Sequence, residues 1–267
     1  MLFFAVGAAS TAQAQGTIVD GPVSFVRGVS PWDGSPGADF KGVAANAAED
    51  QLFEVGWWFR TTADTSESVL GTPSAQSYGG ASSVIDWTDV GTRALFSAQE
   101  VTTVINLDPG SSPQGEVWMT LRLTNLSQVN SLTLDVFNMV DFDLGGTSGS
   151  DSAVLLPDGM HIRITDAGGV FAEYVAPGAS AYLVRPFGAT DVGAVLGNSA
   201  VDDFDNSGLP FGPGDFTAGM QWSGITLPPA GSQDLVVHLL VNAAAPPLDR
   251  IFADGFDMDN APTIAPQ

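Results

Sequence analysis

Turn-forming residues divide this chain into short pieces. Its 267 residues include 31 Gly and 17 Pro, and turn-forming clusters separate about a dozen runs in which apolar and polar residues alternate. No run keeps the helical period of about 3.6 residues for more than about three turns. Alternation with a period of two places successive side chains on opposite faces of a strand. The pattern predicts an all-β fold, a large antiparallel β-sandwich that forms a single domain over residues 15–245.

The clearest alternation lies between residues 116 and 140. Apolar and polar residues alternate from Glu116 to Thr124, and a second alternating run from Leu132 to Val140 follows a turn. We predict that these two runs pair as an antiparallel hairpin. Both faces of the second run are partly apolar, so we expect it at a central position. One short helix is expected, from Ala44 to Asp50.

Charge and cysteine content restrict the chemistry. Thirty Asp and Glu face only eight Lys and Arg, which gives a formal net charge of −22, and there is no Cys. This charge repels a phosphate backbone, so nucleic acid is not expected as a partner. The absence of Cys excludes thiol catalysis, iron–sulfur clusters and cysteine zinc sites. Divalent cations are natural counter-ions for so many carboxylates, although a solvated acidic surface has the same composition.

The first residues have the pattern of an export leader. A short apolar run precedes Ala12 and Ala14, which fit the A-x-A signal that a signal peptidase reads, so residues 1–14 are expected to be a signal peptide. No Lys or Arg precedes the run, which suggests a start further upstream, and a buried first strand is the alternative. No other stretch has the roughly 20 apolar residues of a membrane helix. We expect a secreted protein or one at the exterior of a bacterial cell envelope.

The last residues differ in composition from the rest. Pro246 and Pro247 cannot continue a strand ladder, so residues 246–267 are expected to be a tail. Residues 249–257, DRIFADGFD, resemble a short C-terminal motif of exported gammaproteobacterial proteins, which implies an envelope or extracellular destination. The tail is expected to form a hook for self-association or sorting through Ile251, Phe252, Asp254, Gly255 and Phe256.

A second resemblance covers most of the chain. The stretches Asp141 to Thr147, Gly212 to Phe216 and Gln221-Trp222 are similar to conserved exported bacterial β-sandwich proteins of unknown function. The resemblance implies the fold and export, and it implies no catalytic residue.

Two acidic groups are candidate metal sites. Asp203, Asp205, Ser207 and Gly208 match the start of a calcium loop, in which oxygens at alternate positions converge on the ion. Gly214 stands where an EF-hand needs Glu, so we expect a calcium loop between strands, closed by Asp215 or by Asp202. The alternative is a turn whose Asp and Asn side chains bind their own backbone.

The second and weaker candidate is Asp141, Asp143 and Asp151. Asp141 and Asp143 share one face of a strand, about 6 to 7 Å apart, and two like charges at that spacing favour a cation between them. A solvated strand end is the alternative.

Aromatic residues suggest a sugar ligand. Trp57 and Trp58 are adjacent in a strand and point to opposite faces, so one of them could stack on a carbohydrate; burial in the core is the alternative. His161 is expected to face outwards with Arg163, and His238 to lie in the core. Two unlinked His and the absence of a G-x-S-x-G motif leave no signature of a catalytic triad.

These observations favour an exported, non-catalytic β-sandwich protein that acts in binding or assembly, stabilised by calcium and with a polysaccharide as its partner. Two alternatives remain open. One is a carbohydrate-active enzyme of sandwich fold, for which Glu54, Glu67 and Glu100 are available as paired carboxylates. The other is a self-assembling matrix or filament subunit that docks through its tail.

Overall fold

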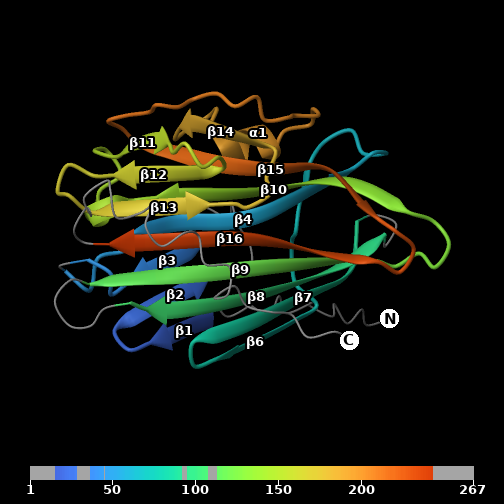
Figure 1. The fold of residues 1–267 in the computed structure, drawn as a ribbon, viewed down its shortest axis with the longest axis horizontal. Coiled ribbons are helices and arrows are strands. Elements are labelled where there is room, and N and C mark those ends of the chain that lie inside the picture. The colour runs from blue at the N-terminus through green and yellow to red at the C-terminus, as the bar shows by residue number, and fades with distance from the viewer. Residues whose placement is uncertain (1–15, 29–36, 45, 92–94, 108–112, 243–267) are drawn as a thin grey trace, which may run out of the picture.

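The fold is that of an all-β sandwich, as predicted. The computed structural model describes residues 16–28, 37–44, 46–91, 95–107 and 113–242. Within these residues the chain forms sixteen strands, one short α-helix and a 3₁₀ turn at Leu144–Gly146 (Figure 1). The elements are β1 (Gly16–Asp20), β2 (Val23–Arg27), β3 (Ala38–Lys41), β4 (Leu52–Thr61), β5 (Ser68–Val69), β6 (Ala75–Gly79), β7 (Ser82–Val90), β8 (Phe96–Asn106), β9 (Gln114–Asn125), β10 (Leu132–Phe142), β11 (Ser152–Leu155), β12 (His161–Thr165), β13 (Phe171–Val175), β14 (Ala181–Pro186), α1 (Val192–Leu196), β15 (Phe216–Leu227) and β16 (Ser232–Asn242).

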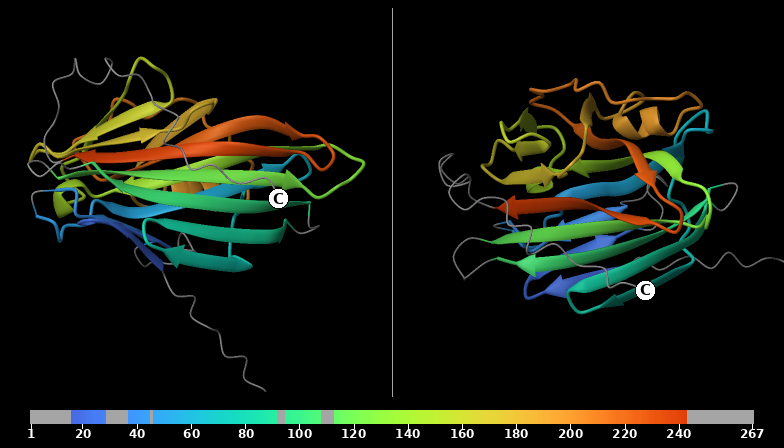
Figure 2. Two further views of the ribbon diagram at one scale, coloured as in Figure 1. Left: turned by 60° about the horizontal axis from the view of Figure 1, so that its bottom comes forward. Right: turned by 45° about the vertical axis from the view of Figure 1, so that its right-hand side comes forward.

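The strands form three antiparallel sheets. The largest has eight strands in the order β11-β12-β13-β16-β9-β8-β7-β6, which run from top to bottom in Figure 1. The second has five strands in the order β14-β15-β10-β4-β5, and the third contains β1, β2 and β3. Strands β1 and β2 contact β8, and β3 contacts β4, so the small sheet lies beside the five-stranded sheet (Figure 2).

The main core lies between the large sheet and the other two. Alternate residues of β8 and β9 point into it, among them Phe96, Val104, Val117 and Met119, and all four are buried. Their neighbours along each strand form the outer face of the large sheet. The predicted alternation from Glu116 to Thr124 therefore separates an inner from an outer face.

A second, smaller core covers the other face of the five-stranded sheet. Trp58 of β4 and Phe137 of β10 pack there against α1 and against Phe204. Gly219 of β15 faces the same layer, and a Cβ atom at this position would lie 2.8 Å from side-chain atoms of Phe204 and of Val192. The strands β4 and β10 are consequently buried on both faces, which explains why their sequences are apolar on both.

The predicted hairpin of residues 116–140 is wrong. Strand β9 lies in the eight-stranded sheet between β16 and β8, whereas β10 lies in the five-stranded sheet between β15 and β4. The connection passes from one sheet to the other, and the Asn125 side chain holds it by donating to the carbonyl oxygens of Asn130, Leu227 and Pro228. Alternation fixes which face of a strand is buried but not which strand is its neighbour. The predicted central position of the second run is confirmed.

The predicted helix from Ala44 to Asp50 is also wrong. The described part of this segment forms bends and a turn, in which the Asn46 side chain accepts the backbone N–H of Ala48. Asn side chains compete in this way with helical hydrogen bonds. The short helix α1 lies elsewhere, and its N-cap Asp191 accepts the N–H of Ala194. No helix in the described residues has the length and hydropathy needed to cross a membrane.

A buried ion pair connects the three sheets. Glu100 of β8 accepts from Arg27 of β2 at 3.1 and 3.2 Å, from the Trp57 indole of β4 at 2.7 Å and from the Thr102 hydroxyl at 2.8 Å. Glu100 is fully buried and Arg27 nearly so. The two carboxylate oxygens thus receive four hydrogen bonds, which offset the cost of removing the charge from water.

We predict that Glu100→Gln destabilises the fold by about 3 kcal/mol, because it leaves the Arg27 guanidinium buried without its counter-charge. Urea unfolding followed by tryptophan fluorescence measures this. Asp205→Asn, the same change of acid to amide at an exposed position, is the control and should shift stability by less than about 0.5 kcal/mol. Equal stabilities for the two variants would contradict this role of Glu100.

Candidate metal centre

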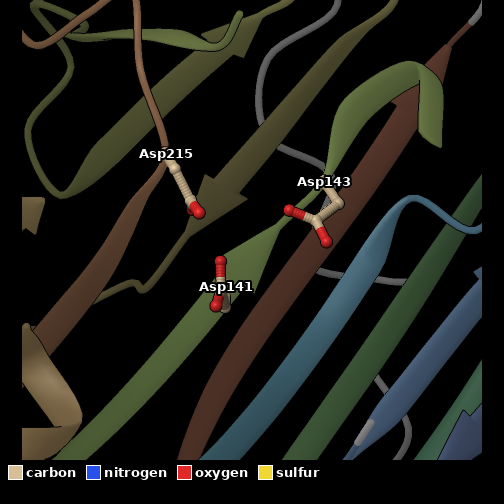
Figure 3. Close-up of side chains that lie close together, drawn as sticks. All are labelled: Asp141, Asp143 and Asp215. Carbon is tan, nitrogen blue, oxygen red and sulfur yellow. The ribbon is translucent and has the colours of Figure 1, made fainter. Parts of the chain in front are cut away.

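The register of β10 and β15 brings three carboxylates together. Asp141 on β10 lies opposite Thr217 on β15 in an antiparallel pair. Two residues beyond Asp141 and two residues before Thr217, a continuation of the same register would place Asp143, just after β10, opposite Asp215, just before β15. Carboxylate oxygens of Asp141, Asp143 and Asp215 all lie within 4.8 Å of one another. Figure 3 shows the three side chains directed towards a common space.

Other acidic groups surround this triad. Glu54 of β4 lies opposite Asp141 on its other side, and it is buried. Asp191, the N-cap of α1, is close enough to raise the pKa of Asp141 and of Asp215. Among the described residues, no ion pair joins a basic side chain to Asp141, Asp143 or Asp215. The three carboxylates of the triad therefore have no basic counter-charge in an ion pair with the described residues.

Asp141 is the most unusual member of the triad. It is only 2% exposed, and its Oδ1 atom has no hydrogen-bond partner among the described residues. Asp151, which follows the 3₁₀ turn, has the same property: it is fully buried, its Oδ2 accepts the N–H of Leu144 at 3.2 Å, and its Oδ1 has no partner. Burial of a carboxylate oxygen without a hydrogen-bond donor or a cation costs free energy of folding, so such oxygens are rare in native proteins.

Burial and mutual repulsion raise the pKa values of these groups. Burial, with the charges of Asp143 and Asp215 next, raises the pKa of Asp141 to about 9. Burial raises the pKa of Asp143 to about 6, and it raises that of Asp151 to about 7 even though the N–H of Leu144 opposes the shift. The pKa of Asp215 is also raised, mainly by burial. Without a cation, Asp141 holds a proton at neutral pH.

The donor set suits a hard divalent cation. Ca²⁺ takes six to eight oxygen ligands and favours carboxylates, of which the triad offers three. Asp143 and Asp215 are partly exposed, so an ion could enter from solvent and keep water among its ligands. A bound cation would displace the proton of Asp141, because it replaces the repulsion between like charges by attraction.

The structure combines parts of the two predicted acidic groups. Asp215, expected to close the Asp203 loop, lies instead with Asp141 and Asp143. Asp151 lies outside the triad, although its pKa is raised by the charges of Asp143 and Asp215. Glu54 and Asp191 were not predicted as members of the site. Pairing of the strand ends after β10 and before β15 is the signal that could have identified Asp215.

The other predicted calcium ligands make contacts within the protein. Asp203 accepts from the Arg60 guanidinium at 2.6 Å and from the Gln221 amide at 2.9 Å, and Arg60 lowers the pKa of Asp203. Asp205 is exposed and accepts from the Ser207 hydroxyl at 2.5 Å. In the described residues, neither acid belongs to a group of three or more convergent ligands. These bonds join side chains, and those of Asp203 reach residues distant in sequence, so they differ from the alternative prediction of a turn whose side chains bind their own backbone.

The predicted sugar-stacking role of Trp57 and Trp58 is corrected by their burial. Trp57 is 1% exposed in the main core, and Trp58 is 3% exposed in the second core beneath α1. Both faces of β4 are covered, so neither ring can stack on a ligand from solvent. Glu67, a candidate catalytic carboxylate, accepts a hydrogen bond from the Arg60 guanidinium at 2.6 Å.

His161 and Arg163 do not face open solvent as predicted, since both are buried. Two acids explain this: the carboxylate of Glu173 on the neighbouring strand β13 lies 2.6 Å from Arg163 and 3.3 Å from His161, and that of Asp158 lies 2.9 Å from His161. His238, expected in the core, lies on the outer face of the large sheet, where its ring stacks on Trp118 with centroids 4.1 Å apart. The predicted signal peptide and the tail residues Ile251, Phe252, Asp254, Gly255 and Phe256 lie outside the described residues.

Comparison with known proteins identifies the fold and no family. No protein-family model and no curated protein sequence matches this chain. Among solved structures, a putative aldose 1-epimerase from Escherichia coli K12 is similar, with a TM-score of 0.55 and 11% identity over 85% of this chain and 98% of that one. A putative kojibiose phosphorylase from the human microbiome has a TM-score of 0.37 and 8% identity, and the match covers 26% of its chain. The first likeness supports the β-sandwich fold.

We predict that, with divalent cations removed, the free energy of unfolding falls as the pH rises from 5 to 9. The unfolded Asp side chains ionise near pH 4, whereas Asp143, Asp151 and Asp141 hold their protons to about pH 6, 7 and 9 in the fold. The folded state binds more protons across this window, so a rise in pH favours unfolding, by about 1.4 kcal/mol per pH unit for each such proton.

Urea unfolding in EDTA at a series of pH values measures this slope. Asp141→Asn carries no titrating group at this position, so its slope should be shallower than that of the wild type over the whole range from pH 5 to 9. A stability that rises steadily from pH 5 to 9 in the wild-type protein would contradict the assignment of the raised pKa values.

Proposed function

We propose that this chain is an exported β-sandwich protein that binds calcium through Asp141, Asp143 and Asp215 and acts in binding or assembly at the bacterial exterior, without catalysis. The observation that carries the proposal is the unpartnered Oδ1 of Asp141, a nearly fully buried atom in a convergent group of carboxylates. A proton or a cation must neutralise such a group, and a cation also supplies the missing partner.

The position of the site suggests what the ion does. Asp141 and Asp143 lie at and just beyond the end of β10, and Asp215 lies just before β15, which is the neighbour of β10 in the interior of the five-stranded sheet. A cation bound by all three would link these strand ends. The backbone N–H of Gly214 donates to the carbonyl oxygen of Asp151 at 2.9 Å, so the same link would extend to the loop before β11. The ion would therefore stabilise the sheet and fix its adjacent loops.

The proposal of a non-catalytic role rests on how the other candidate acids are used. Glu100 receives four hydrogen bonds in the core, and Glu67 is paired with Arg60. Export is proposed from residues 1–14 and from the motif at residues 249–257. Calcium is abundant outside cells, where cation-bound loops can replace the disulfides that this chain lacks.

We predict that added calcium raises the melting temperature at pH 7.5 and that EDTA lowers it. An ion that binds only the folded state stabilises it by about 2.7 kcal/mol at 100 times its Kd. Asp141→Asn should lose most of the calcium-induced shift, because it removes a charged ligand at the buried end of the site. Differential scanning calorimetry measures the shift.

Asp205→Asn is the matched control, and its calcium response should equal that of the wild type. A wild-type melting temperature that is the same in EDTA and in 10 mM calcium would overturn the proposal. A calcium response that survives in Asp141→Asn but is lost in Asp205→Asn would move the site to the loop around Asp203.

A second candidate function is favoured by one observation. Asp141, with a pKa of about 9, stands beside Asp143, with a pKa of about 6, and a neutral acid next to an ionised carboxylate is the pair that glycoside hydrolysis uses. This candidate is a carbohydrate-active enzyme of sandwich fold.

The two functions separate in one assay. An enzyme should release reducing ends from a panel of polysaccharides and lose this activity in Asp141→Asn and in Asp143→Asn. The calcium-binding protein should release none in either calcium or EDTA. Release that both variants retain would place any activity elsewhere and would remove the support for this candidate.

A further inference from the structure

A polar groove lies on the outer face of the eight-stranded sheet, away from the acidic triad. Its volume is about 710 Å³, and it is lined by residues of β7, β8 and β9 together with residues at or just before the starts of β6 and β16. Small-molecule sites in proteins have volumes of roughly 300 to 1,000 Å³. The groove is thus large enough for a small ligand or for part of a chain of sugar units.

Strand register arranges the polar side chains of the groove in a row. Asp86 of β7 lies opposite Gln99 of β8, which lies opposite Arg122 of β9. The Gln99 amide donates to Asp86 at 2.7 Å, and Arg122 makes two bonds to Asp234 at 2.7 and 2.8 Å. These contacts fix planar polar groups in defined orientations, which is the kind of preorganisation that ligand recognition requires.

Hydroxyl groups lie on either side of this row. Ser74 and Thr88 are hydrogen-bonded to each other at 2.8 Å near one end, and Thr124 and Ser232 at 2.8 Å near the other. All four line the groove, as does Ser97. Such a surface offers both donors and acceptors at close spacing, as the hydroxyl groups of a sugar do.

The charge of the groove limits the ligand further. Arg122 is paired with Asp234. Asp86 is the acid among the lining residues, and none of the described ion pairs joins it to a basic side chain. An anionic ligand would meet this carboxylate and the net charge of −22. Trp87, Ala75, Ala98 and Ala230 also line the groove, so it presents apolar surface beside its polar side chains and suits a ligand that combines C–H groups with hydroxyls.

We infer that this groove binds a neutral sugar, at a site separate from the acidic triad and independent of calcium. Asp86, Gln99 and Arg122 would bond to ring hydroxyls, and the serine and threonine hydroxyls would complete the contacts. The inference goes beyond the proposed function, because it names a second site and the class of its ligand.

The test is titration calorimetry of the full chain with neutral pentose and hexose oligosaccharides and with acidic oligosaccharides of the same length. We expect binding of at least one neutral oligosaccharide, with weaker binding of the acidic ones. Ser97→Trp, which places a bulky ring in the groove, and Gln99→Ala should each weaken binding at least tenfold. Ser82→Trp is the matched control, since Ser82 is exposed on the same strand pair but does not line the groove, and it should bind as the wild type does.

The outcomes distinguish this inference from the calcium proposal. Binding that persists in EDTA and in Asp141→Asn supports a separate groove site. Three results would overturn it, whatever the calcium response. They are loss of sugar binding in EDTA, no binding of any neutral oligosaccharide, and equal binding by the wild type and by a Ser97→Trp variant that circular dichroism shows to be folded.

Discussion

Burial of β10 on both faces is the constraint on which the site depends. The main core covers one face of this strand, and the layer of α1 and Phe204 covers the other. Asp141, near its end, is therefore held away from water between Glu54 on β4 and Thr217 on β15. A carboxylate in this position keeps a proton or takes a cation, and the same register that buries it brings Asp143 and Asp215 to it.

Comparison of Asp141 with Glu100 separates a structural carboxylate from a candidate ligand. Both are buried acids on strands that have a neighbour on each side in their sheets. Glu100 receives hydrogen bonds from Arg27, Trp57 and Thr102, so its charge is balanced and its lone pairs are used. Asp141 has acidic neighbours instead, and one of its oxygens has no partner in the described residues. The first arrangement stabilises a fold without a ligand, whereas the second is stable at neutral pH only with a bound proton or ion.

The sequence predicted the local features of this protein better than its long-range ones. Alternation over Glu116–Thr124 identified the strand and its inner face. The same period of two, applied to residues 141–143, predicted that Asp141 and Asp143 lie close together. It could not show that residues 125–131 cross between sheets, because a hairpin and a crossing between sheets have the same pattern of side chains. Asp215 was grouped with Asp203 by closeness in sequence, although strand pairing places it with Asp143. The sequence allowed either burial of Trp57 and Trp58 or stacking of one of them on a sugar. Only the second core, which covers the other face of β4, shows that both are buried.

At the proposed site calcium replaces a proton at a buried carboxylate, and titration calorimetry at pH 7 in buffers of different ionisation enthalpy tests this directly. If Asp141 is protonated in the free protein, calcium should bind with about one ion per chain and release protons, and the measured heat should change with the buffer. Proton release should be smaller in Asp141→Asn. Absence of calcium binding at millimolar concentrations, or binding with a heat that is the same in every buffer, would contradict the account.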